Sequence, residues 1–184
     1  TDPFFTDRGF AEAVGQLQLL EIGFGSIGYI FVSHYHYDHM PRLPAHAPQY
    51  AFKLLVPGES ERFPDVRAVD LPGHDPFLRA LAFTSIAGKR VWVVGDAILN
   101  EEWLRAWEYY WPNGYEPDEI MQTWRSTAVV LAEADVILPG HGQPILITPD
   151  LLRALAAGFT RAEYAERCPD VLETLHHRLA QIGP

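Results

Sequence analysis

Hydrophobic and polar positions along the chain separate into short apolar runs and stretches with helical spacing. The apolar runs are rich in β-branched and aromatic residues and often end at Pro-Gly or Gly, which predicts strands. These strands are expected at 29–33, 50–56, 66–71, 78–86, 90–94 and 136–138. Helices are expected at 10–20, 101–110 and 117–132, from 148 onward, and at 169–181. Strands interleaved with helices predict a layered α/β protein.

Two of the expected helices carry recognisable start signals. Pro117 is followed by two acidic residues, the usual composition of a first helical turn. Thr148 precedes Pro149 and Asp150 and is suited to cap the helix that follows.

A dense group of imidazoles and one carboxylate follows the strand at 29–33 directly. It reads His34-Tyr35-His36-Tyr37-Asp38-His39. In an extended or turning backbone, alternate side chains point the same way, so His34 and His36 can grip one ion. Asp38 and His39 can turn toward a second. Imidazole and carboxylate suit zinc, iron and manganese.

Three more candidate ligands lie at the ends of predicted strands, and each follows a glycine. They are His74 in Pro-Gly-His, Asp96 in Gly-Asp, and His141 in Pro-Gly-His-Gly. Glycine lets the backbone approach a metal closely, because it has no Cβ to clash. Catalytic groups also gather where strands give way to irregular loops.

These four motifs, taken together, resemble the metallo-β-lactamase superfamily. HxHxDH at 34–39, PGH at 72–74, GD at 95–96 and PGHG at 139–142 occur in the family's order, and the resemblance extends over about residues 1–147. It implies an αβ/βα sandwich, in which two facing mixed sheets are covered by outer helices and the metals lie at one edge. Residues 148–184 are expected to be a C-terminal helical extension of a single domain spanning 1–184.

The resemblance also implies a role for each ligand. His34, His36 and His74 would hold the first ion. Asp38, His39 and His141 would hold the second, and Asp96 would bridge the two. The expected cofactor is a pair of divalent ions, with zinc favoured and iron or manganese as alternatives.

Hydrolysis is the reaction that such a centre predicts. Two cations about 3.5–4 Å apart lower the pKa of a shared water from 15.7 toward 7. The metal-bound hydroxide would cleave an ester, lactone, thioester or phosphoester. Asp38 and Asp96 are the residues expected to take part in catalysis, Asp38 as a proton shuttle and Asp96 as the bridge.

The beginning of the sequence departs from the family pattern. Members of the family carry an N-terminal Asp that braces the His-rich loop, and Asp2 and Asp7 both fit. Several strands usually precede that Asp, and here none does. Either upstream sequence is missing or the first sheet is curtailed. A curtailed sheet would leave an exposed edge and favour a homodimer.

Composition narrows the classes of partner. The net charge of −10 argues against a nucleic-acid groove, which needs Lys and Arg to neutralise phosphates. No apolar run approaches the ~20 residues of a membrane span, and no leader peptide is recognisable. The one cysteine, Cys168, fits a reducing cytoplasm. A small-molecule substrate and a cytoplasmic location are therefore expected.

Two other functions remain open. Some family members use a single iron to oxidise sulfur compounds with dioxygen, and their ligands overlap with these. A non-catalytic scaffold is the third reading, although such proteins typically lose ligands and all seven are present here.

Several further residues allow a structural or a functional reading. Asp75 is either a turn residue or a partner of a metal-bound His. The aromatic residues after Asp96 form either core or a substrate wall, and a Tyr hydroxyl among them could stabilise an oxyanion. The aromatic candidates are Trp103, Trp107, Tyr109, Tyr110, Trp111, Tyr115 and Trp124. A metal role is not expected for His46, His176 or His177, and no catalytic role for Cys168.

Overall fold

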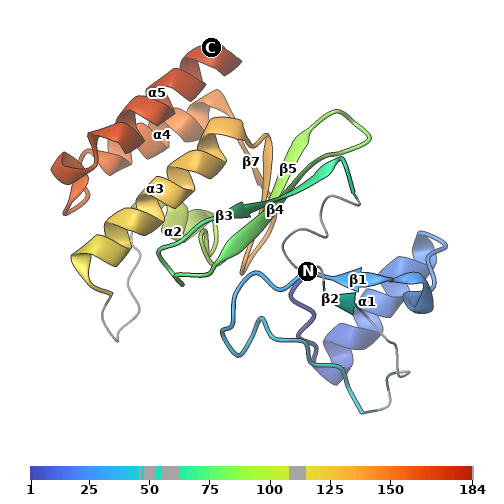
Figure 1. Cartoon of the computed structure of the whole chain (residues 1–184). Helices are drawn as coiled ribbons and strands as arrows, with labels where there is room; N and C mark the ends of the chain where they lie inside the picture. Colours follow the sequence, from blue (N-terminus) through green and yellow to red (C-terminus); the bar gives the residue numbers. More distant parts are fainter. Residues whose placement is uncertain (46, 48–52, 55–62, 108–114, 184) are drawn as a thin grey trace. The chain divides into compact units, whose positions relative to one another are not determined.

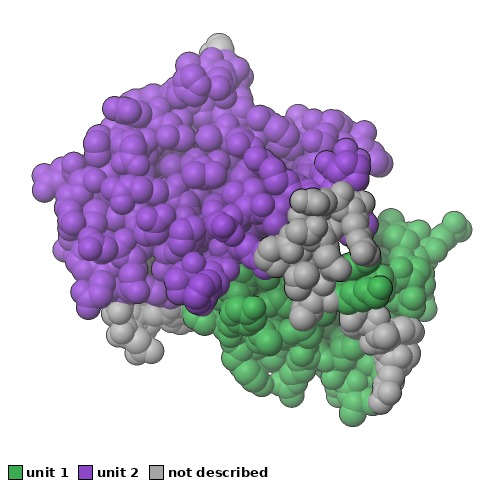
Figure 2. Space-filling model, viewed as in Figure 1, with its two compact units in different colours: residues 1–62 green, residues 63–184 purple. Residues whose placement is uncertain are grey.

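A computed structural model describes residues 1–45, 47, 53–54, 63–107 and 115–183. The chain divides into two compact units, Thr1–Arg62 and Phe63–Pro184, which Figure 2 colours green and purple. Each unit has its own packing and is described by itself. The expectation that 1–184 form one domain stays a prediction.

The first unit contains one long helix, α1 (Asp7–Leu19). It begins three residues earlier than expected because the Thr6 side chain caps it, accepting a hydrogen bond of 3.1 Å from Gly9 N. Phe10 is the buried residue of this helix and packs edge-on against Phe5 and Phe24, with ring centroids 5.8 and 5.0 Å away.

The rest of the first unit has little regular structure. A 3-10 turn, η1 (Phe24–Ser26), precedes β1 (Tyr29–Ile30), which pairs in parallel with β2 (Lys53–Leu54). The predicted strand at 29–33 is thus shorter than expected. Its last part pairs with the N-terminal segment instead, through Asp2 N to Phe31 O at 2.7 Å. Most of the predicted strand at 50–56 lies outside the described residues.

The second unit is built on a mixed five-stranded sheet with the order β3-β4-β5-β6-β7. The sheet consists of β3 (Val66–Asp70), β4 (Arg79–Thr84), β5 (Arg90–Gly95), β6 (Val136–Pro139) and β7 (Ile145–Leu146). The β5–β6 pair is parallel and the other three pairs are antiparallel. The strands predicted at 66–71, 78–86, 90–94 and 136–138 correspond to β3, β4, β5 and β6, whereas β7 was not predicted.

Helices join β5 to β6 and follow β7. They are α2 (Glu101–Ala106), α3 (Pro117–Glu133), α4 (Pro149–Phe159) and α5 (Pro169–Ile182), with a 3-10 turn η3 (Ala165–Arg167) before the last. In Figure 1, α3, α4 and α5 lie together beside the sheet. The Thr148 side chain caps α4 as expected, accepting from Leu151 N at 3.1 Å.

The core of the second unit lies between one face of the sheet and these helices. Ala82, Trp92, Ile137 and Ile145 are neighbours in register across four strands, and all are buried. Leu131, Leu152, Leu155 and Leu175 belong to the same cluster from the helical side. Alternation along each strand sends Val91 and Phe83 to the opposite face. A second sheet facing this one, as the sandwich requires, stays a prediction.

Among the described residues, no helix has the length and apolar character needed to cross a bilayer.

Candidate metal centre

The His-rich segment of the first unit forms a tight turn after β1. His39 N donates to His36 O at 3.0 Å, which closes the turn. The ring of His34 lies 4.5 Å from that of His36 and 4.2 Å from that of His39, centroid to centroid. Asp38 lies at the edge of this group, with Oδ2 3.9 Å from His39 Nε2. The three imidazoles that the motif predicts as ligands therefore gather in one place.

Asp2 braces this turn, which decides between the two N-terminal acids. Its Oδ1 accepts from Ser33 N at 2.7 Å, and its Oδ2 lies 3.2 Å from Nδ1 of His39. Asp2 adopts a φ of +43°, a conformation that L residues other than Asn and Asp rarely accept. Asp7 lies in the first turn of α1 and is exposed. The bracing acid is thus Asp2.

The candidate ligands of the second unit centre on Asp96, which directly follows β5 and is buried. Its Oδ2 lies 3.4 Å from Nε2 of His74, and its Oδ1 lies 3.4 Å from Nε2 of His141. Each carboxylate oxygen thus faces a different imidazole. The three strand-end motifs, which are distant in the sequence, converge on this one side chain.

Gly140 makes this convergence sterically possible. A Cβ at position 140 would overlap Oδ1 of Asp96 and come within 2.9 Å of the Gly95 carbonyl. The backbone beside it is tied down, because Gly140 N donates to Ile98 O at 3.1 Å and His141 N to Leu99 O at 2.8 Å. Glycine is therefore required before His141, for its close approach to Asp96 and Gly95; the approach to a metal that the motif predicts stays a prediction.

Helix α3 fixes the loop that carries His74. Gly73 has a φ of +139°, and a Cβ there would overlap the backbone and hydroxyl of Thr123. Ser126 Oγ donates to Pro72 O at 2.6 Å, and Thr127 Oγ1 donates to Ala97 O at 3.2 Å beside Asp96. Ser126 and Thr127 thus brace two loops that carry candidate ligands, and Thr123 packs closely against Gly73. Sequence reasoning missed this role, although polar residues on the otherwise apolar face of α3 were a usable signal.

Tyr115 contacts His74 directly. Its hydroxyl lies 3.1 Å from Nδ1 of His74 and donates to the carbonyl oxygen of the same residue at 3.3 Å. Burial, and then the negative charge of Asp96, raise the pKa of Tyr115 to about 12, so its hydroxyl keeps its proton at neutral pH. The contact with His74 differs from the oxyanion contact that the sequence suggests for Tyr115, and no local pattern indicates it.

The buried histidines share one arrangement. The Nδ1 atoms of His34, His39 and His74 lie near Ser33 Oγ at 3.0 Å, Asp2 Oδ2 at 3.2 Å and Tyr115 Oη at 3.1 Å, respectively. A ligating His commonly engages a protein group through one ring nitrogen and the metal through the other. Imidazoles oriented in this way have the donor chemistry of a site that could hold a metal ion.

The seven predicted ligands thus form His- and Asp-rich groups that could hold a metal ion. His34, His36, Asp38 and His39 belong to the first unit, and His74, Asp96 and His141 belong to the second. That all seven serve one centre stays a prediction.

Other residues singled out in the sequence have structural roles. Trp107 and Trp124 are core residues, and Trp107 Nε1 donates to Leu155 O at 2.8 Å. Asp75 is a turn residue whose Oδ1 accepts from Phe77 N at 2.7 Å. Cys168 is buried and free at the start of α5. His46, Tyr109, Tyr110 and Trp111 lie outside the described residues.

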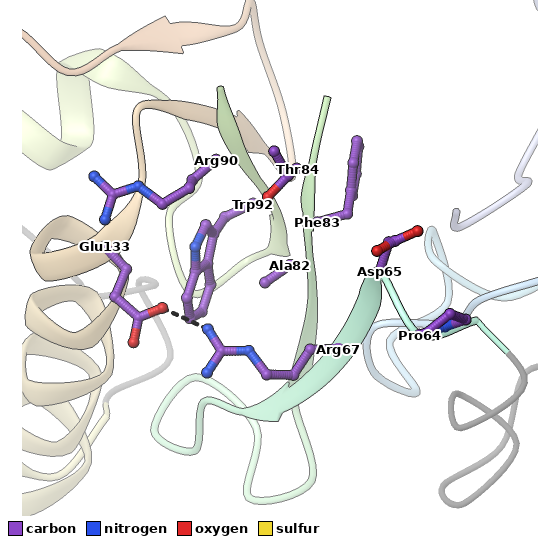
Figure 3. Close-up of a pocket in the computed structure, with 9 residues that line it drawn as sticks. All are labelled: Pro64, Asp65, Arg67, Ala82, Phe83, Thr84, Arg90, Trp92 and Glu133. Carbon is purple, nitrogen blue, oxygen red and sulfur yellow. Dashed lines mark hydrogen bonds and ion pairs between the residues drawn. The ribbon is translucent and has the colours of Figure 1, made fainter. Parts of the chain in front are cut away.

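A separate cavity of about 330 Å³ lies at the other end of the second unit's sheet. It is lined by Pro64, Asp65, Arg67, Ala82, Phe83, Thr84, Arg90, Trp92 and Glu133 (Figure 3). The Arg67 guanidinium lies over the Trp92 ring, 5.4 Å from the ring centroid, which is within cation–π range. The same guanidinium pairs with Glu133 (Figure 3). Thr84 is the last residue of β4 and pairs with Arg90, the first residue of β5. Both therefore lie at the end of β5 opposite to Gly95. None of the predicted ligands lines this cavity.

Comparison with known proteins gives no family for the chain: no protein-family model matches it, and no curated protein matches it significantly.

Proposed function

We propose that this protein is a metal-dependent hydrolase of the metallo-β-lactamase type, with two divalent ions, zinc being favoured. The observation that carries the proposal is the position of Asp96, whose two carboxylate oxygens each face the Nε2 atom of a different histidine at 3.4 Å. Asp96 would help to hold both ions, because it lies between two imidazoles that could each bind one.

The proposed ligand assignment follows the motifs. His34, His36 and His74 hold one ion, Asp38, His39 and His141 hold the other, and Asp96 lies between them. The assignment requires the ligands of Thr1–Arg62 and those of Phe63–Pro184 to meet at the same ions. The gathering of imidazoles within each unit supports it, as does the occupation of Nδ1 in His34, His39 and His74.

The chemistry divides between the ions and the chain. When bound, a pair of divalent ions supplies a water of lowered pKa as a nucleophile at neutral pH. The chain orients the imidazoles through Asp2, Ser33 and Tyr115. Gly140 leaves room for the Asp96 carboxylate, because it has no Cβ. The side chain of Asp38 is about half exposed, at 51%, which suits a group that exchanges protons with solvent.

The substrate we propose is a small ester, lactone or thioester, with phosphoesters as an alternative. The net charge of −10 disfavours the phosphate backbone of a nucleic acid as the natural substrate.

The test is metal analysis of protein purified without added metal, followed by assays with lactones, thioesters, nitrophenyl esters and phosphodiesters. We expect two zinc ions per chain and turnover of at least one carboxylic ester class. Asp96→Ala and His36→Ala should abolish turnover with an unchanged far-UV circular dichroism spectrum. His176→Ala, on an exposed part of α5, is the matched control and should keep full activity.

Three outcomes would contradict the proposal. One iron per chain with oxygen consumption on sulfur compounds would favour the dioxygenase reading. Metal-free, inactive protein would favour a scaffold. Full activity of Asp96→Ala would remove the bridge.

A further inference from the structure

The hydroxyl of Tyr115 engages two atoms of His74 at once. It lies 3.1 Å from the ring Nδ1 and 3.3 Å from the carbonyl oxygen, and the two rings are tilted by 45° with centroids 5.7 Å apart. A single hydroxyl therefore fixes both the backbone and the ring of this histidine.

Only one placement of the protons makes hydrogen bonds of both contacts. A phenol has one hydrogen, and the contact with the His74 carbonyl oxygen needs it, because that oxygen can only accept. The phenol oxygen can then only accept from Nδ1, which must carry the proton of the neutral imidazole. The lone pair is left on Nε2, the atom that faces Asp96. Tyr115 thus selects the tautomer that can bind a metal through Nε2.

Asp96 favours the opposite tautomer. Its Oδ2 lies 3.4 Å from Nε2 of His74, so a proton on Nε2 would be drawn toward the carboxylate. Without the phenol, this tautomer would be stabilised, and a metal would first have to displace that proton. The hydroxyl of Tyr115 therefore opposes a hydrogen bond from Nε2 of His74 to the Asp96 carboxylate.

Both partners are held by the same helix. Tyr115 directly precedes Glu116, which forms a capping box with Glu119 at the start of α3. The loop of His74 is fixed to α3 by Ser126 and by the close approach of Gly73 to Thr123. The hydrogen bond is thus built into the fold before any ligand arrives.

From this geometry we infer that Tyr115 is a positioning residue for His74, which keeps the proton on Nδ1 and presents Nε2 to a divalent cation. The metal-binding part of this inference rests on the proposed function, whereas the choice of tautomer does not.

Tyr115→Phe tests the inference, because it removes only the hydroxyl. Tyr164→Phe is the matched control: Tyr164 lies in the same unit, is also partly buried, and packs against Trp124. Each variant is read in two ways. Nitrogen-15 NMR of the metal-free protein reports the tautomer of His74, assigned with a His74→Gln variant. Competition with a chromophoric chelator reports the affinity for zinc.

In wild type and Tyr164→Phe, we expect His74 to carry its proton on Nδ1. In Tyr115→Phe, we expect Nε2 to be protonated and zinc to bind about 10–100-fold more weakly, the usual effect of losing such a partner. An unchanged tautomer in Tyr115→Phe overturns the inference. If wild type binds no zinc at all, the proposed function fails, and the tautomer alone then decides the role of Tyr115.

Discussion

The Oδ2 atom of Asp2 lies 3.2 Å from Nδ1 of His39, although the two residues stand at opposite ends of the segment that builds the His-rich turn. The other oxygen of Asp2 accepts from the backbone of Ser33, which directly precedes His34. One carboxylate thus holds both ends of the HxHxDH motif. The His-rich loop depends on this N-terminal residue as well as on its own sequence.

Asp2→Asn should weaken zinc binding about 10–100-fold, since the amide is a poorer acceptor for the imidazole and can present its NH2 group to Nδ1. Chelator competition measures the change. Asp7→Asn is the matched control, because Asp7 is an exposed residue of the first turn of α1, and it should bind zinc as wild type does. Equal affinity in Asp2→Asn and wild type would show that the brace is dispensable.

Gly140→Ala should disrupt the Asp96 carboxylate, because the added methyl group would overlap Oδ1. We expect loss of metal binding, and a decrease in unfolding free energy of about 1–3 kcal/mol from overpacking. Gly28→Ala is the control, since a Cβ at Gly28 meets no atom within 4 Å. Urea unfolding and metal analysis measure the two effects. A Gly140→Ala protein with wild-type metal content would contradict the steric argument.

The Asp135 carboxylate should make the unfolding free energy depend on pH, and this effect is separate from the candidate metal centre. It accepts from Arg90 at 2.9 Å and from Arg178 at 2.8 Å, and hydrogen bonds from Arg90 are the largest influence holding its pKa well below the usual range. A carboxyl group whose pKa is lower in the folded state stabilises the fold above its unfolded pKa of about 3.9. That contribution is lost as the pH falls below this value.

Asp135→Asn should therefore reduce the unfolding free energy at pH 7 by about 1–3 kcal/mol, the usual effect of losing a hydrogen-bonded charge. The difference from wild type should shrink when urea unfolding is repeated at progressively lower pH below 4. Asp118→Asn is a suitable control, since the Asp118 side chain that pairs with Arg167 is 86% exposed. A difference that stays constant down to pH 2 would contradict the role given to the Asp135 charge.

The elements of the second unit were largely predictable, because their periodicity and end signals agree. Pro117 starts α3, Thr148 caps α4, and the apolar run 90–94 forms the centre of the sheet. By contrast, β7 was missed, since a two-residue strand has no periodicity. The strand at 29–33 was overestimated because Phe31 pairs with Asp2, a long-range contact that no local pattern reveals.

The candidate ligands were predictable because each motif combines a chemically specific residue with a strand end and a glycine. The residues that orient them were harder to find. Asp2 and Asp7 look equivalent in the sequence, and only the fold distinguishes them. Ser126 and Tyr115 are common residue types whose roles depend on contacts with Pro72 and His74, which are distant in the chain.

The central claim is that the ligands of the two units hold the same ions. The most direct measurement is zinc stoichiometry after gel filtration for wild type, His34→Ala, His74→Ala and the double variant. If His34 and His74 bind the same ion, wild type should hold two zinc ions per chain, and each single variant and the double variant should all hold one. A double variant that holds none, while each single variant holds one, would show that the two residues serve different ions and would contradict the account.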